Sequence, residues 1–404
     1  MLARSLLLAS LLSCGACSKS QPLRPAGAAG ADESGAAGAA QASDLTVTVF
    51  DAARVSSNPD DPNFQELGSD LDLSAGPYAS AMLIADLATT CVPFSAWADD
   101  PPPKGQNWPA DCDAFDRNFE ISLDGPEPSD AKGSIGPSSS SEGGTGGESG
   151  AGGANGEGGA SDARLGVPVG LELVRAITPF GGPMHIERDL TGIANGLSGI
   201  HRLHVKIGTW ADSAGLVTGS NAGWNVTVRL ALNKGVAPSQ PLAIIPLFYG
   251  DLTSVAEVSR SFTVPEGTVR GYLEYRTTGH GGAVGDAFSC TGPAEEFCKR
   301  QHTIKLDGET IKNFTPWKAC ASHCTVGNSE GDPGFAYCEE NPCGAIESVT
   351  APRANWCPGS ETDPVVIDPP ALAVPGPHDV SVQVSQIAAG GSVRVSLTYY
   401  AFAN

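Results

Sequence analysis

Residues 226–232 read Val-Thr-Val-Arg-Leu-Ala-Leu, and every second side chain in this stretch is a large apolar one. A period of two places those side chains on one face of an extended strand and the others on the opposite face. The same alternation recurs at residues 45–49, 380–384 and 393–397, with a turn expected at Gly390-Gly391 before the last of them. We find no long segment with the period of an amphipathic helix. The pattern is typical of an all-β protein, and strands this frequent favour sandwich domains.

Turn chemistry adds a hairpin to this picture. Asp307-Gly308 stands between two short strand-like segments, residues 303–306 and 310–314, and predicts a tight two-residue turn. Residues 131–162 are rich in Ser and Gly, and their composition by itself suggests a domain linker.

The N-terminus is typical of an export signal. A single charge at Arg4 precedes an apolar run at residues 6–12, which is too short to span a bilayer, and then Ser13-Cys14. We predict a lipoprotein-type signal peptide over residues 1–17, with lipid attachment at Cys14; Cys17 is the second candidate. Residues 18–43 are predicted to form a disordered tether. The protein is thus expected to be exported, either lipid-anchored at the outer membrane or cell surface or secreted, with membrane contact only through the lipid.

Charge and cysteine content narrow the possible functions. The chain has 24 basic and 45 acidic side chains, for a net charge of −21, which argues against nucleic-acid binding. Eleven cysteines in an exported chain favour disulfides. Setting Cys14 and Cys17 aside leaves an odd number, so one cysteine is free or Cys17 has a distant partner. The same oxidising context favours disulfides over a zinc site at Cys320 and Cys324.

Short motifs carry the chemistry of this chain. They are Cys112-Asp113-Ala114-Phe115-Asp116-Arg117; Thr209-Trp210; Gly279-His280-Gly281; Cys290 with Glu296-Phe297-Cys298 and His302; Cys338-Glu339-Glu340-Asn341-Pro342; and Arg353-Ala354-Asn355-Trp356-Cys357-Pro358-Gly359. Together they resemble the peptide-N-glycosidase F family, amidases that cut N-linked glycans from asparagine. The resemblance is best from residue 246 to the end and moderate over residues 45–234. In the first motif Phe115 stands where the family usually has tryptophan.

The resemblance implies two consecutive eight-stranded antiparallel jelly-roll sandwich domains, stabilised by disulfides. We place the N-terminal domain at residues 44–236 and the C-terminal domain at 237–404, with the boundary between residues 234 and 241. Residues 119–123 and 171–175 then become neighbouring strands of one domain. Residues 131–162 become a long disordered insertion within that domain, which loop-closure entropy tolerates.

The family's functional residues map onto this chain by motif. Asp116 and Glu296 are implied as the catalytic carboxylates, facing one cleft between the domains; Glu295 competes with Glu296 for its role. The implied substrate-binding residues are Arg117, Arg353, Trp210, His280 and Trp356. The implied disulfides are Cys91–Cys112, Cys290–Cys298 and Cys338–Cys357; the family offers no counterpart for Cys320, Cys324 or Cys343. The resemblance implies a monomer that acts on a glycoprotein or glycopeptide, with no metal and no cofactor.

One departure from the family leaves the activity open. The third acid of the family's site precedes Thr-Trp, and here that position is Gly208; Asp212 is nearby but four residues further on. We therefore keep a non-catalytic glycan- or protein-binding lipoprotein as the alternative, in which Asp113 and Asp116 merely cap a solvated turn. A copper- and ascorbate-dependent monooxygenase is the remote alternative because its fold is similar. None of the seven histidines forms a His-His or His-x-His pair that would hold copper.

Overall fold

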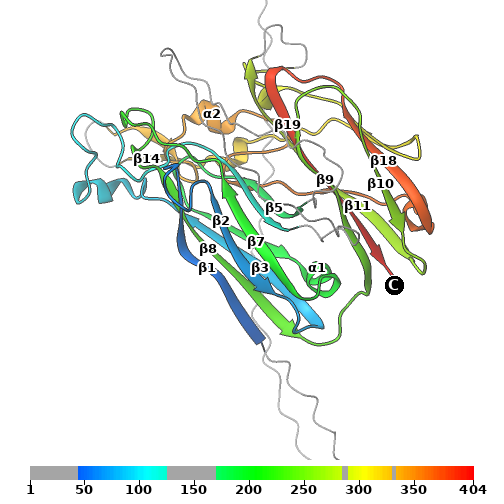
Figure 1. Cartoon of the computed structure of the whole chain (residues 1–404). Helices are drawn as coiled ribbons and strands as arrows, with labels where there is room; N and C mark the ends of the chain where they lie inside the picture. Colours follow the sequence, from blue (N-terminus) through cyan, green and yellow to red (C-terminus); the bar gives the residue numbers. More distant parts are fainter. Residues whose placement is uncertain (1–43, 125–169, 284–289, 330–333) are drawn as a thin grey trace, which may run out of the picture. The chain divides into compact units, whose positions relative to one another are not determined.

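The computed structural model describes residues 44–124, 170–283, 290–329 and 334–404 (Figure 1). The predicted signal peptide with Cys14 and Cys17, the predicted tether and the insertion expected at residues 131–162 lie outside these ranges. Residues 42–404 form one compact unit. Within the described ranges, no helix combines the length and apolarity that crossing a membrane requires.

The first half of this unit is a sandwich of two antiparallel sheets. One sheet has the order β1 (Asp44–Ser56), β8 (Gly223–Lys234), β3 (Tyr78–Ala88), β6 (Met184–Asp189). The facing sheet has the order β5 (Leu171–Ile177), β4 (Asn118–Leu123), β7 (Ile200–Ile207), β2 (Glu66–Asp72), and β16 (Ser360–Glu361) from the far end of the chain is added beside β5.

The second half repeats this design. One sheet has the order β10 (Val258–Val264), β18 (Gly376–Val384), β12 (His302–Leu306), β13 (Glu309–Phe314); the other has the order β17 (Val365–Ile367), β11 (Arg270–Ala283), β19 (Ala389–Phe402), β9 (Pro241–Leu252). A small hairpin, β14 (Val326–Asn328) with β15 (Ala336–Cys338), lies outside the sheets. The described helices are short: α1 (Thr191–Gly196), α2 (Ile346–Thr350), and the 3-10 turns η1 (Phe94–Ala98), η2 (Glu295–Phe297), η3 (Ala321–His323) and η4 (Pro370–Ala373). The expected all-β sandwich fold is confirmed.

Alternation along the strands explains the two cores. In β8, Val226 and Val228 are fully buried and Leu230 and Leu232 are 1% exposed, whereas Thr227 between them is partly exposed. Burying one such side chain stabilises the fold by roughly 1.5–3 kcal/mol, so a strand of this pattern is fixed in register by its apolar face. One core fills the first sandwich and another the second.

The hairpin and the strand pairing around the insertion are confirmed. Leu306 pairs with Glu309 across Asp307 and Gly308, whose φ angles of 51° and 85° are those of a primed turn. Strands β4 and β5 pair antiparallel, with Ile121 opposite Val174. The expected turn at Gly390-Gly391 lies at the start of β19: the Gly391 N–H donates to the Ala388 carbonyl oxygen at 2.9 Å, Gly390 has a φ of 71°, and Gly391 already pairs with Gly281.

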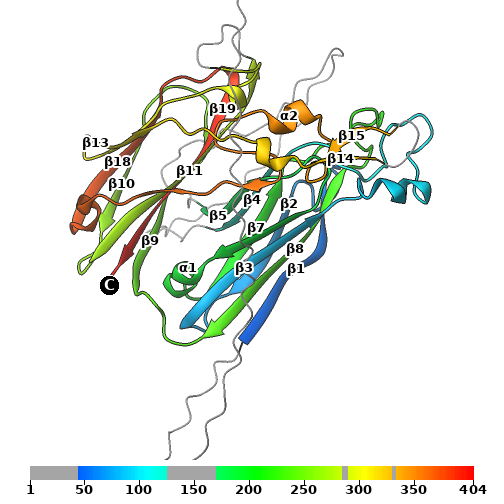
Figure 2. The same cartoon turned by 180° about the vertical axis from the view of Figure 1, so that it is seen from behind.

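Buried charges join the two halves where β4 and β5 meet β9 and β19 (Figures 1 and 2). Arg394 of β19 donates to both carboxylate oxygens of Glu120 of β4 at 2.8 Å. The Tyr249 hydroxyl of β9 donates to the same carboxylate. Beside them, Arg175 donates to Glu172 within β5 at 2.8 Å and to the Arg394 carbonyl oxygen at 2.7 Å. Each charge is therefore paired across or beside the junction, as a buried charge requires.

Candidate active site

Disulfides close the loops that carry the site. Cys91–Cys112 and Cys290–Cys298 form as expected. Asp113 directly follows Cys112, and the buried Arg300 lies two residues after Cys298. Four disulfides in the described part of the chain fit an exported protein.

The expected Cys338–Cys357 disulfide is wrong. Cys357 pairs with Cys320, and Cys338 pairs with Cys324. Backbone pairing explains the first bond, because Lys318 and Arg353 exchange hydrogen bonds at 2.9 Å and so bring the two segments together. The β14–β15 hairpin explains the second, because Cys338 lies opposite Val326. Cys343 is the free cysteine of the described residues.

Asp113 organises the N-terminal side of the site. Its carboxylate is fully buried and accepts bonds from Arg117 (2.7–3.1 Å), from the Thr209 hydroxyl at 2.7 Å and from the Trp224 indole at 3.2 Å. The interpretation of Asp113 as the cap of a solvated turn is wrong. Sequence reasoning missed this role, although the spacing of four residues between Asp113 and Arg117 was a usable signal.

The next carboxylate along, Asp116, meets Glu296 at a single guanidinium group. Nη1 of Arg353 donates to Glu296 at 2.6 Å, and Nη2 of Arg353 lies 4.0 Å from a carboxylate oxygen of Asp116. Nη2 also donates to the Ser348 carbonyl oxygen at 2.9 Å. The three groups come from three parts of the chain: the loop before β4, the turn η2, and the segment after α2. The structure therefore brings the two implied acids together at the junction of the two sandwiches.

Backbone pairing places Arg353 at this junction. The Ala354 N–H donates to the Glu296 carbonyl oxygen at 2.7 Å, and the Trp356 indole donates to the Gly279 carbonyl oxygen of β11 at 2.9 Å. Four residues later the chain joins the first sandwich, where Ser360 pairs with Ile177 of β5. The segment thus crosses from one half to the other. Arg353 itself is 1% exposed, so its guanidinium lies behind the acids and not on an open surface.

Glu295 and Glu296 have different surroundings. Glu295 is fully buried and its carboxylate is held by Arg300, at 2.7 and 2.9 Å, and by the Ala388 N–H at 2.7 Å. The Glu296 side chain is 25% exposed and faces Arg353. Only the second arrangement leaves a carboxylate accessible from solvent, which favours Glu296 over Glu295 as the reactive acid.

Both accessible acids hold protons more tightly than usual. Burial raises the pKa of Asp116 to about 6; the Glu296 charge also raises it, while Arg353 and Arg117 oppose the shift. Burial also raises the pKa of Glu296, against the opposing effect of Arg353. A carboxyl group that titrates near neutral pH can act in proton transfer, which an ordinary surface carboxylate does poorly.

Aromatic rings flank the acids on two sides. On the N-terminal side, the Phe115 and Trp210 rings lie 5.5 Å apart, and the Arg117 guanidinium lies 5.1 and 4.9 Å from their centres. The Arg117 side chain is already bonded to Asp113. It therefore lines the site and is not a free hydrogen-bond donor for a ligand.

On the C-terminal side, Arg353 lies 4.8 Å from the centre of the Phe297 ring and 4.4 Å from that of Trp356. His280 stacks on Trp356 with 5.7 Å between ring centres. Trp356 is 2% exposed. Burial, assisted by Arg175, lowers the pKa of His280 to about 3, which keeps the imidazole neutral.

Gly208, which stands at the position of the family's third acid, borders free space. No atom lies within 4 Å of the place where a Cβ on Gly208 would stand. Asp212 does not fill the gap, because its carboxylate caps a local turn by accepting from the N–H groups of Ala214, Leu216 and Val217 at 2.7–3.0 Å. These bonds lower the pKa of Asp212 and hold it ionised.

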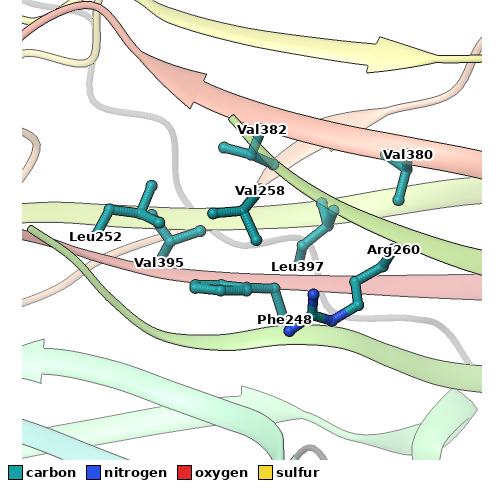
Figure 3. A pocket seen from close by; sticks show the side chains of 8 residues that line it. All are labelled: Phe248, Leu252, Val258, Arg260, Val380, Val382, Val395 and Leu397. Carbon is teal, nitrogen blue, oxygen red and sulfur yellow. The ribbon is translucent and has the colours of Figure 1, made fainter. Parts of the chain in front are cut away.

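Two small cavities lie outside this group of acids, and neither has room for a substrate. One lies at the edge of the second sandwich, between β9 and β10, and has an apolar lining with Arg260 at its border (Figure 3). The other lies behind Glu295 and Arg300. Each has about 10 Å³ of room, which suits a single water molecule. Among the described residues, the grouping with metal-ligand spacing is Cys91, Cys112 and Cys343, two of which are bonded to each other.

The structure thus defines an all-β protein of two antiparallel sandwiches with a pair of carboxyl groups at their junction. Residues 248–401 match the family model described as "Peptide-N-glycosidase F, C terminal". No curated protein matches the chain significantly.

Solved structures match over both halves. A peptide-N(4)-(N-acetyl-β-D-glucosaminyl) asparagine amidase has a TM-score of 0.59 at 15% identity, covering 90% of this chain and 97% of that one. PNGase F from Flavobacterium meningosepticum, described as a glycosylasparaginase, has a TM-score of 0.57 at 16% identity, covering 90% and 96%. PNGF-II has a TM-score of 0.58 at 18% identity, covering 89% of this chain; this chain spans 65% of that longer one. The resemblance to the peptide-N-glycosidase F family is confirmed, by the family model for the C-terminal part and by the fold for both halves.

Proposed function

We propose that this protein is a peptide-N-glycosidase-like amidohydrolase that cleaves the glycosyl-asparagine amide of a glycoprotein, a glycopeptide or a related glycoconjugate. The observation that carries the proposal is the meeting of Asp116 and Glu296 at Arg353. Two accessible carboxyl groups with raised pKa values, placed in unlike surroundings around one buried cation, can take different roles in one reaction.

We assign the proton transfers to Asp116 and the orientation of the reacting groups to Glu296 and Arg353. Asp116 makes no contact shorter than 4.0 Å with Arg353, and its pKa of about 6 lets it take a proton from water near neutral pH. The water oxygen then bonds to the asparagine carbonyl carbon, the carbon–nitrogen bond breaks, and the proton goes to the departing glycosylamine. The products are aspartate and a glycosylamine.

The test is release of glycan from a purified glycoprotein. We expect the wild type to release glycan and to leave aspartate at the glycosylation site. Asp116→Asn and Glu296→Gln should each lose at least about 100-fold in rate. Asp70→Asn is the matched control, because Asp70 is an acid of β2 whose side chain is 72% exposed and pairs with Arg202 at the surface. Full activity in Asp116→Asn would contradict the proposal.

The second candidate is a non-catalytic glycan-binding protein of the same fold. Gly208 favours it, because the place of the family's third acid is empty space. Binding of a free N-glycan by both the wild type and Asp116→Asn, with no release by either, would establish this candidate.

We further propose that the protein is exported as a monomer and that Cys14 carries a lipid. Metabolic labelling with a radioactive fatty acid tests the anchor, and Cys14→Ser should abolish the label. Label that persists in Cys14→Ser and disappears in Cys17→Ser would move the anchor to Cys17.

A further inference from the structure

A row of aromatic side chains lies outside the candidate active site. It consists of Phe94, Trp97, Trp108, Phe335 and Tyr337, and we call it the aromatic row. The first three come from the loop closed by Cys91–Cys112, and the last two from the β14–β15 hairpin, more than 200 residues later. Figures 1 and 2 both show η1 and β14 at the same end of the molecule.

Edge contacts hold the row together. Trp108 meets Trp97 with 5.9 Å between ring centres, and Trp97 meets Phe94 with 5.7 Å. Phe94 then meets Phe335 at 5.6 Å and Tyr337 at 5.5 Å. Disulfides brace both contributing loops, so the rings are positioned before any partner arrives.

The row is open to solvent at its end. Phe335 is 54% exposed, and Phe94, Trp97, Trp108 and Tyr337 are partly exposed. Contiguous exposed aromatic surface is unusual on a soluble protein and is enriched where a protein binds another chain.

Apolar packing connects the row to the candidate active site. Trp108 and Cys343 pack against Cys91, Cys112 and Ala114. Cys343 and Phe115 both pack against the neighbouring cluster of Phe180, Cys338 and Val349. Phe115 precedes Asp116 in the chain, so interior packing links the loop that carries the row to the loop that carries Asp116.

The chemistry of the row favours an apolar stretch of polypeptide over a sugar. The Trp97 indole N–H is already bonded to the Cys91 carbonyl oxygen at 3.0 Å, and Phe94 and Phe335 have no polar side-chain atoms. The C–H face of a sugar can also stack on a ring, but its hydroxyls need matching polar groups, whereas apolar side chains need only the rings. The exposed acids Asp99 and Asp100 beside η1 disfavour an anionic membrane surface.

We propose that the aromatic row docks an extended apolar segment of the substrate's polypeptide, beside the asparagine that the acids act on. This inference rests on the proposed function for the identity of the substrate, but the binding itself is measurable without catalysis. The row would then select glycoproteins by their protein part, independently of the glycan.

The test uses a fluorescent 12-residue peptide that carries no sugar and contains Leu, Phe and Tyr at alternating positions. We expect the full chain to bind it, as measured by fluorescence anisotropy, and Phe335→Ser to weaken binding about fivefold or more. Val374→Ser is the matched control, because Val374 is equally exposed, at 54%, and lies outside the row. Phe335→Trp should bind the peptide as the wild type does, because it keeps an aromatic ring at this position, and an unchanged Tm of Phe335→Ser separates a docking role from a folding defect.

The inference would be overturned if Phe335→Ser and the wild type bound the peptide equally, or if an N-acetylglucosamine oligomer competed with the peptide. It would also be overturned if the wild type bound phosphatidylglycerol vesicles and Phe335→Ser lost this vesicle binding but still bound the peptide. The two proposals fail separately. Loss of peptide binding in Phe335→Ser without any glycan release refutes the amidase alone. Glycan release with the same KM for a large glycoprotein in both proteins refutes the docking surface alone.

Discussion

Arg353 is the residue on which the candidate site depends. A buried guanidinium must be paired, and here Glu296 and the Ser348 carbonyl oxygen accept from it while Asp116 remains 4.0 Å away. The unequal distances give the two acids unlike surroundings. Unlike surroundings are what separates the roles of two chemically similar groups.

The pKa of Asp116 gives a prediction of pH dependence. Because Asp116 must be ionised to act as a base, we expect glycan release to fall as the pH drops below about 6. Glu296→Gln removes a negative charge that raises the pKa of Asp116, so the acid limb of its residual activity should move to lower pH. The measurement is kcat/KM between pH 4 and 8. An acid limb that does not move in Glu296→Gln would show that the two groups are not coupled.

The same shift affects stability with a defined sign. The folded-state pKa of Asp116 is above the unfolded value of about 3.9, so the folded state binds more protons between pH 4 and 6. Ionising Asp116 therefore destabilises the fold as the pH rises through this window. Asp116→Asn should gain stability over the wild type at pH 7 relative to pH 4, as measured by urea unfolding. An equal difference at both pH values would place the titration elsewhere.

Gly208 offers a gain-of-function prediction. Space is open at its Cβ position, so Gly208→Glu should fold with an unchanged Tm. If the missing acid limits the rate, Gly208→Glu should raise glycan release by about 100-fold. Gly208→Gln is the control, because it has the same size without the charge. An equal effect of both substitutions would show that the carboxylate is not the cause.

At the scale of elements, small local structures decide how the disulfides pair. The β14–β15 hairpin and the Lys318–Arg353 bridge bring Cys324 and Cys320 to partners that differ from those the family resemblance implies. The Cys320–Cys357 bond ties the segment that carries Arg353 to the turn before η3. The position of Arg353 therefore depends on a covalent link at Cys357, four residues further along the chain.

Disulfide mapping tests this pairing. Non-reducing peptide mass spectrometry should find Cys357 bonded to Cys320, and Cys338→Ser should leave that bond intact. Replacing Cys320 and Cys357 together by serine opens a bond between residues 37 apart in sequence, which should cost about 3–4 kcal/mol of unfolding free energy. A Cys338–Cys357 peptide would restore the original prediction.

At the scale of the whole molecule, the junction between the sandwiches is held by charge as well as by apolar packing. Burial alone would raise the pKa of Glu120, but the charge and hydrogen bonds of Arg394 outweigh it and lower the pKa to about 2. The ends of β9 and β19 also contribute Ile244, Tyr400 and Phe402 to the core of the first sandwich. The two halves therefore support each other, and the site at their junction is held in place by both.

Arg394→Met should destabilise the protein by about 3–5 kcal/mol at pH 7, because it leaves Glu120 buried without its partner. In the wild type this contribution is fully present above the unfolded pKa of about 4.3 and is lost as the pH falls towards 2. The difference between wild type and variant should therefore shrink at pH 3, as measured by urea unfolding. Arg202→Met is the control: its pair with Asp70 is exposed and should matter by less than about 1 kcal/mol.

Residue patterns along the chain predicted several strands and one hairpin of this fold. Alternation along residues 226–232 predicted β8 because a half-buried strand has no other way to hide its apolar side chains. Asp307-Gly308 predicted its hairpin because the turn needs positive φ angles that few residues tolerate. The motifs also led to Asp116 and Glu296, which the structure brings to one guanidinium.

The partners of the cysteines and of the buried charges follow from the folded arrangement of distant segments. The Cys320–Cys357 and Cys324–Cys338 bonds, the burial of Asp113 and Glu295, and the exposure of Glu296 all depend on which segments meet in space. Spacing along the chain does not contain that information, because a disulfide or an ion pair depends on distances of a few ångströms between segments far apart in sequence. For the same reason the aromatic row could not be predicted: its two halves are distant in the chain and come together only in the fold.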